Sequence, residues 1–154
     1  MDEKSRSGKV TIEKGNIIWR FEDNEVVKVP YEKIKLIGEF TNANGPLMDD
    51  WFLVIYNDDL EYYEISMYAN NITESLAELG ELMGFELYGT LFTSIEWKSN
   101  ILYPTKFKGN EIWDIVKPEP KSFLDKLKSL LGFNNEQLKL TKVAENIVNQ
   151  NTIS

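Results

Sequence analysis

The side chains in this chain that could do chemistry are mostly carboxylates, and they gather in one stretch. Asp49 and Asp50 stand beside Trp51, and a carboxylate pair next to an aromatic wall is an arrangement used in sugar hydrolysis. A second group follows the apolar run after Trp51 and offers oxygen ligands of the kind that Ca²⁺ takes: Asp58, Asp59, Glu61 and Glu64.

Neither group has the spacing that its chemistry requires. Adjacent residues of a strand point to opposite faces of a sheet, so Asp49 and Asp50 do not converge on one substrate. The second group lacks the D-x-D-x-D-G pattern of a calcium loop, and turns favour Asn and Asp without any metal. The chain has no histidine, no cysteine and no glycine-rich phosphate loop, which removes the imidazole bases, the thiol nucleophiles and the usual zinc ligands. We therefore predict no catalytic residue, no cofactor site and no metal site.

The distribution of charge points to association with a basic partner. Twelve acidic residues lie between Leu36 and Trp97 with no lysine or arginine among them, and the formal net charge of the chain is −8. Such a surface repels phosphates, so we predict no nucleic-acid partner. It attracts a positively charged protein if the acids gather on one face. The alternative interpretation is that the charges only keep a small domain soluble.

Tyrosines accompany the acids, and tyrosine is favoured at protein interfaces. Tyr62, Tyr63, Tyr68 and Tyr88 are candidates for a recognition surface, although sheet packing is the expected role of at least half of them. From the acids and tyrosines together we predict a partner-binding surface made of Asp49, Asp50, Asp58, Asp59, Glu61, Tyr62, Glu64 and Tyr68.

These residues fall on a predicted β-hairpin. Residues 51–56 form a short apolar run, Asn57-Asp58-Asp59 is a turn signal, and residues 62–68 then alternate between polar and apolar side chains. Short extended segments between residues 10 and 41 predict an antiparallel meander before the hairpin. After it, apolar residues at helical spacing predict a helix over 72–83 that Gly84 ends, and extended sequence resumes over 85–116.

A proline-containing segment divides the chain. Lys117-Pro118-Glu119-Pro120 predicts a linker over 117–121, between a β-rich domain at 1–116 and an amphipathic helical tail at 122–154. The tail contains two helical patterns, over 122–131 and 136–148. The apolar face of the first is made of Phe123, Leu124, Leu127, Leu130 and Leu131. We expect this face to pack on its own domain or on a partner chain, and the alternative is contact with a membrane surface.

One segment also carries a family resemblance. Val29-Pro30-Tyr31-Glu32-Lys33-Ile34 resembles the V/I-P-Y-x-x-I sequence that introduces a strand in bacterial pleckstrin-homology-like (PH-like) domains, and the similarity covers about residues 10–70. The resemblance implies a partly closed β-barrel that serves as a binding scaffold. The family usually finishes with one helix across the barrel, whereas here the helix over 72–83 precedes more extended sequence.

We predict an α+β fold: an antiparallel, strongly bent sheet or partial β-barrel with one internal helix and a C-terminal two-helix tail. The amino terminus has no apolar signal segment, so we expect a cytoplasmic protein. As function we predict a non-catalytic interaction module of bacterial type that binds a basic protein. A concrete form is an immunity or inhibitor protein whose acids cover the basic cleft of a nuclease-like toxin. The alternatives are a small-ligand or lipid-binding barrel with the tail helix as lid or membrane anchor, and a carboxylate-dependent enzyme.

Overall fold

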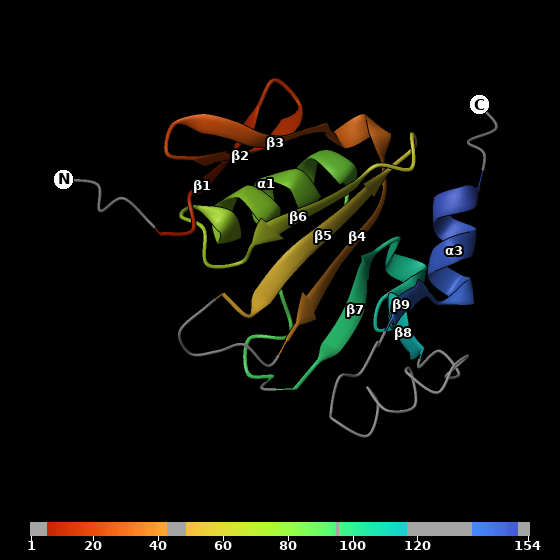
Figure 1. Ribbon diagram of the computed structural model, residues 1–154. Helices are drawn as coiled ribbons and strands as arrows, with labels where there is room; N and C mark the ends of the chain where they lie inside the picture. The colour runs from red at the N-terminus through yellow and green to blue at the C-terminus, as the bar shows by residue number, and fades with distance from the viewer. Residues whose placement is uncertain (1–5, 43–48, 95, 117–136, 151–154) are drawn as a thin grey trace.

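The architecture comes from a computed structural model that describes residues 6–42, 49–94, 96–116 and 137–150. The described part is α+β, as predicted, with three sheets of antiparallel strands and two α-helices (Figure 1). The prediction of one bent sheet or partial barrel is not met, because these strands divide among three sheets and no closed barrel forms among them. Pro30 and the 3-10 turn Tyr31–Lys33 separate the third strand from the fourth, so the two strands join different sheets.

The first sheet is a meander of three strands. It consists of β1 (Lys9–Glu13), β2 (Asn16–Phe21) and β3 (Asn24–Pro30), in that spatial order. Two-residue turns join them, Lys14-Gly15 and Glu22-Asp23, and all four turn residues have positive φ. Two positive-φ residues are the turn geometry that matches the right-handed twist of paired strands, so the predicted meander forms as far as Pro30, and the segment from Ile34 to Thr41 joins another sheet.

The second sheet contains the predicted hairpin. Its four strands are β4 (Ile34–Thr41), β5 (Trp51–Asn57), β6 (Tyr62–Ser66) and β7 (Lys98–Tyr103), in the order β6-β5-β4-β7 (Figure 1). The β5–β6 pair confirms the hairpin. Residues 85–94, 96 and 97 form no strand, so the prediction that extended structure resumes at residue 85 is wrong, and β7 begins only at Lys98.

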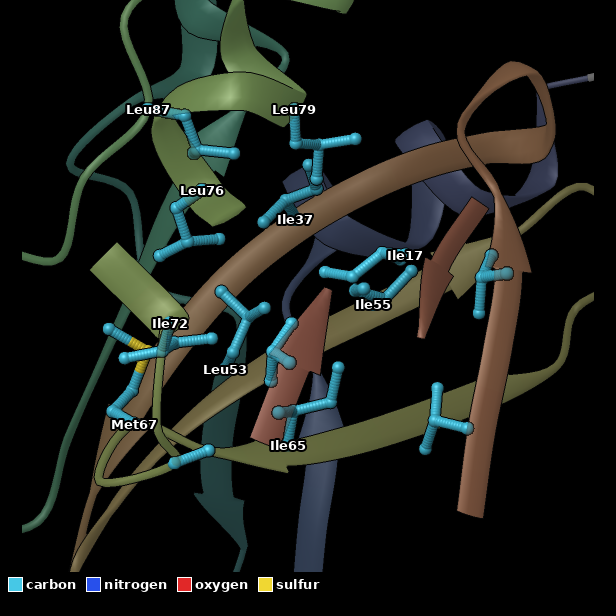
Figure 2. Packing of buried hydrophobic residues seen from close by; sticks show 14 of the residues in the cluster. Ile17, Ile37, Leu53, Ile55, Ile65, Met67, Ile72, Leu76, Leu79 and Leu87 are labelled. Atoms are coloured by element: carbon cyan, nitrogen blue, oxygen red, sulfur yellow. The ribbon is translucent and has the colours of Figure 1, made fainter. Parts of the chain in front are cut away.

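Helix α1 (Ile72–Met83) has the bounds that the periodicity predicts, and Gly84 ends it at φ 87°, a left-handed conformation that favours glycine. The helix lies between the first two sheets (Figure 1). Its apolar face meets side chains from both, as Figure 2 shows for Leu76 and Leu79 above Ile37 and Leu53. The main members of this first core are Val10, Ile17, Val29, Ile37, Leu53, Ile55, Ile65, Ile72, Leu76 and Leu79.

A second core covers the other face of the four-stranded sheet. The 3-10 turn Thr105–Phe107 leads from β7 to β8 (Trp113–Val116), which pairs with β9 (Gln137–Leu140), and α3 (Lys142–Asn149) packs near β4. The buried residues of this core are Leu36, Phe40, Val54, Ile101, Ile112, Trp113, Ala144, Ile147 and Val148. The part of the tail that the structure describes is therefore packed against the sheet.

The prediction of helix over 136–148 is wrong in its first turn, because residues 137–140 pair with β8 as a strand. Thr141 separates the two elements. Its hydroxyl accepts a hydrogen bond from the N–H of Ala144, which caps α3, and donates to the carbonyl of Glu111. The predicted linker over 117–121, the helix over 122–131 and its contact residues Phe123, Leu124, Leu127, Leu130 and Leu131 lie outside the described residues.

Candidate protein-interaction surface

The predicted surface residues lie along β6 and at the two ends of the β5–β6 hairpin. Asp49 and Asp50 come just before β5, and Tyr68 follows β6, so these three share one end. Tyr62 and Glu64 belong to β6 itself. The remaining acids form the turn at the far end of the hairpin, namely Asp58, Asp59 and Glu61. The structure thus brings the set onto one hairpin, in three groups instead of one cluster.

Tyrosine hydroxyls are the partners of three of these carboxylates. Within β6 the hydroxyl of Tyr62 donates to Glu64, and that of Tyr63 donates to Glu61 beside it. At the other end the Tyr68 hydroxyl donates to Asp50. This last bond, assisted by burial and by the charge of Asp50, raises the pKa of Tyr68 to about 12. The predicted surface combines tyrosines and acids, and hydrogen bonds join three such pairs in the structure.

The ring of Tyr62 also packs against two other aromatic rings. Its ring centroid lies 5.0 Å from that of Tyr56 and 6.0 Å from that of Trp113. Burial is the largest cause that raises the pKa of Tyr62, and the bond to Glu64 adds to it. With 39 % of its surface still exposed, Tyr62 is a fixed aromatic side chain at the molecular surface. Such side chains lose little conformational entropy when a partner covers them.

The side chain of Asn57 organises the turn of the hairpin. The side-chain carbonyl of Asn57 accepts the N–H groups of Asp59 at 3.0 Å and Glu61 at 2.9 Å, which closes the turn. Asp59 meets Lys33 at 3.5 Å, an exposed ion pair that contributes little to stability. Over the described ranges, no three acidic side chains converge as ligands of one ion.

Asp49 differs from the other acids of the set because its partners are two serine hydroxyls that both bond its Oδ2 atom. It accepts hydrogen bonds from the hydroxyls of Ser7, at 2.8 Å, and Ser66, at 2.6 Å. The carboxylate therefore ties the segment before β1 to the end of β6. Asp50, its neighbour, accepts the Tyr68 hydroxyl at the surface, so the two adjacent acids have different partners.

An exposed phenylalanine beside this end of the hairpin escaped the sequence analysis. Phe92 is 75 % exposed, and its ring lies 5.9 Å from that of Trp51, which also makes an edge contact with Tyr68. The loop that carries Phe92 can approach Trp51 because of Gly89, where a Cβ atom would come within 2.4 Å of the indole. A single glycine in a loop is too common a pattern to have predicted this contact.

Glu39 was also missed, and it is the acid with the most unusual position. It lies in the middle of β4 with no exposed surface. Its two carboxyl oxygens accept the N–H of Thr90 at 2.7 and 3.0 Å, and one also accepts the Thr90 hydroxyl. Asn100, the register partner of Glu39 in β7, donates to that hydroxyl at 2.8 Å. The signal in the sequence was a glutamate with apolar neighbours, since it follows Leu36-Ile37-Gly38 and precedes Phe40.

Comparison of the chain with protein-family models, with curated proteins and with solved structures found no match. Neither helix in the described part of the chain is long and apolar enough to cross a membrane. The conclusions about function therefore rest on the geometry of the hairpin and on the charges that it carries.

Proposed function

We propose that this chain is a non-catalytic interaction module whose β5–β6 hairpin binds a basic protein. The observation that carries the proposal is the placement of acids along this one hairpin. Asp58, Asp59, Glu61 and Glu64 are exposed, Asp50 is half-exposed, and the hairpin contains no lysine or arginine. Opposite charge across an interface raises the association rate and selects the partner more than it adds affinity.

The tyrosine bonds support the same function. Each hydroxyl bound to a carboxylate fixes the direction of an acid that would otherwise sample several rotamers, so less side-chain entropy is lost when a cation docks. Tyr62 adds an anchored aromatic surface in the middle of the acidic edge. A concrete form of the proposal is an immunity or inhibitor protein that covers the basic cleft of a nuclease-like toxin. The PH-like relationship stays a prediction, and no contact among the described residues favours lipid binding or carboxylate catalysis instead.

Two triple variants of the full chain test this proposal. The hairpin variant carries Asp58→Asn, Glu61→Gln and Glu64→Gln, and the control carries Glu74→Gln, Glu78→Gln and Glu81→Gln, three exposed acids of α1. Both lose three charges. Immobilised wild-type and variant chains are exposed to a lysate at low and high salt, and the captured proteins are identified and ranked by isoelectric point.

We expect the wild type and the α1 variant to capture the same basic protein at low salt and to release it at high salt, because salt screens exposed charges. The hairpin variant should not capture it. An equal loss of capture in both variants would show that binding depends only on the net charge of the chain. Capture that survives high salt, or that favours acidic proteins, would contradict the proposal.

A further inference from the structure

The hydrogen bonds of the hairpin show which way the main chain of β6 faces. The N–H of Asn57 donates to the carbonyl of Glu61 at one end, and the N–H of Met67 donates to the carbonyl of Trp51 at the other. Both pairs belong to the same antiparallel register as β5 and β6. Inward and outward groups alternate along an antiparallel strand, so the odd-numbered residues of β6 bond to β5 and the even-numbered ones face outward.

Tyr62 and Glu64 therefore direct their N–H and C=O groups away from β5. No described residue donates to or accepts from these four groups, and no described strand lies beyond β6 in the sheet. Glu64 is exposed and Tyr62 is partly exposed. The outer edge of β6 is thus a row of backbone groups with the spacing of a sheet and without a neighbour in the described part of the chain.

The opposite edge of the same sheet is covered. In β7 the N–H of Ile101 donates to the carbonyl of Asn110 at 2.8 Å, and its carbonyl accepts the N–H of Gly109 at 3.1 Å. The hydroxyl of Ser99 accepts the N–H of Ile112 at 3.0 Å. The segment that follows β7 folds back along it and bonds the backbone of Ile101, so among the described strands β6 is the edge of this sheet that has no such cover.

β6 also lacks three of the features by which proteins protect an edge strand. Lysine, proline and bulges are the common ones. β3, an edge strand of the three-stranded sheet, has all three features. It contains Lys28 and ends in Pro30, and its register with β2 shifts between Trp19 and Arg20. β6 has no cation and no proline, and its register with β5 is continuous.

We propose that β6 accepts an extended segment of a basic partner protein as an additional strand of the sheet. This inference rests on the proposed function and adds its binding mode. Backbone groups of Tyr62 and Glu64 hold the incoming strand, and a lysine or arginine of that strand lies across from the Glu64 carboxylate, where opposite charges on neighbouring strands attract. The acids of the hairpin turn extend the same attraction beyond the end of β6.

A second copy of this chain fits the edge less well than a basic strand does. If two β6 strands paired antiparallel about their centre, the same sign of charge would face itself across the pair, with Glu64 as the only ionised side chain in the strand. Like charges in cross-strand positions are destabilising. The net charge of −8 on each copy opposes the encounter as well.

The test uses the full chain and a nine-residue peptide of alternating lysine and threonine, with a glutamine–threonine peptide as the uncharged control. Amide hydrogen exchange and chemical shifts are recorded by NMR, and affinities by calorimetry. Glu64→Gln removes the charge and keeps the N–H. Glu64→Pro removes both, but leaves the β5–β6 ladder intact because that N–H faces outward. The exchange of the Tyr63 and Ile65 amides in the unbound variant reports whether the ladder has survived.

We expect the lysine peptide to slow exchange of the Tyr62 and Glu64 amides at least tenfold in the wild type. Glu64→Gln should weaken binding a few-fold, and Glu64→Pro should weaken it about tenfold further, the size of a lost hydrogen bond plus strain at the edge.

Equal affinities of the glutamine and proline variants, or no protection of the two amides, would overturn strand addition. The capture experiment on the hairpin acids would then still decide whether the hairpin binds a basic protein by its side chains. Absence of peptide binding overturns the inference in the same way. Slow exchange of the two amides that depends on protein concentration alone would identify a second copy as the occupant and would also overturn it.

Discussion

Glu39 and Glu64 belong to the same four-stranded sheet, but their carboxyl groups lie in two different environments. Glu39, in β4, has no exposed surface, and its oxygens accept the N–H and the hydroxyl of Thr90. Glu64, in the edge strand β6, is exposed and accepts the hydroxyl of Tyr62. The first carboxyl is bound to a residue 51 positions away, and the second to one two positions away.

The difference teaches that burial together with a distant partner gives Glu39 a structural role, which exposed Glu64 does not have. Glu39 holds the loop that follows α1 against the sheet, because a buried acceptor without its donors would cost free energy of folding. The Tyr62–Glu64 bond joins two residues of one strand and so fixes no tertiary contact. Glu64 can therefore take part in binding without any cost to the fold.

The largest expected effect comes from removing the buried carboxyl. Glu39→Leu leaves the N–H and the hydroxyl of Thr90 without the carboxylate that accepts them, so we expect the free energy of unfolding to fall by about 2–4 kcal/mol. Urea unfolding followed by tryptophan fluorescence measures it. Glu64→Leu is the matched variant, with an expected change within about 0.5 kcal/mol. Similar losses in both variants would abolish the distinction between the two acids.

Thr90→Val tests the same buried hydrogen bonds by changing the partner of Glu39. It removes the hydroxyl that bridges Glu39 and Asn100 and keeps the N–H, so we expect a loss of about 1 kcal/mol in the same unfolding experiment. Combined with Glu39→Leu, it should cost less than the sum of the two single changes, since both remove one network. Full additivity would mean that the hydroxyl acts independently of Glu39.

The hydrogen bond between a surface acid and a tyrosine should change the pKa of that tyrosine. Asp50→Asn removes the main cause of the raised pKa of Tyr68, so we expect that pKa to fall from about 12 toward its ordinary value of 10.0. Because the folded-state pKa is raised, the stabilisation is fully present below about pH 10 and is lost as the pH rises through about 12. NMR titration of the tyrosine ring measures it, with Glu74→Gln as control. An unchanged pKa in Asp50→Asn would place the cause elsewhere.

The smallest effect concerns an exposed acid whose partner is a cation. Two Arg20 nitrogens donate to the Glu13 carboxylate at 2.7 and 3.0 Å, and these bonds lower the pKa of Glu13 to about 2. Its stabilisation is therefore present above about pH 4.5 and is lost as the pH falls through about 2. Arg20→Met should return the pKa of Glu13 toward 4.5, as read from its side-chain carbonyl shift, with little change in stability at pH 7. A pKa that stays near 2 would show that Arg20 is not the cause.

The local pattern of the chain determined several elements of the fold. The hairpin over 51–68, the helix over 72–83 and its end at Gly84 were predicted correctly, and so was the α+β class. Each depends on neighbours within a few positions: strand alternation, the recurrence of apolar residues, or a glycine at positive φ. The sequence also located the acids and tyrosines of the proposed surface, because both lie on that one hairpin.

Only the tertiary structure decided how these elements meet. The division into three sheets, the strand at Gln137–Leu140 and the burial of Glu39 all depend on partners far along the chain. The same holds for the outer edge of β6, because whether another strand reaches it, as none in the described part of the chain does, depends on distant segments. Periodicity records which face of an element is apolar, but not which segment covers it, and that choice is made by packing between residues distant in sequence.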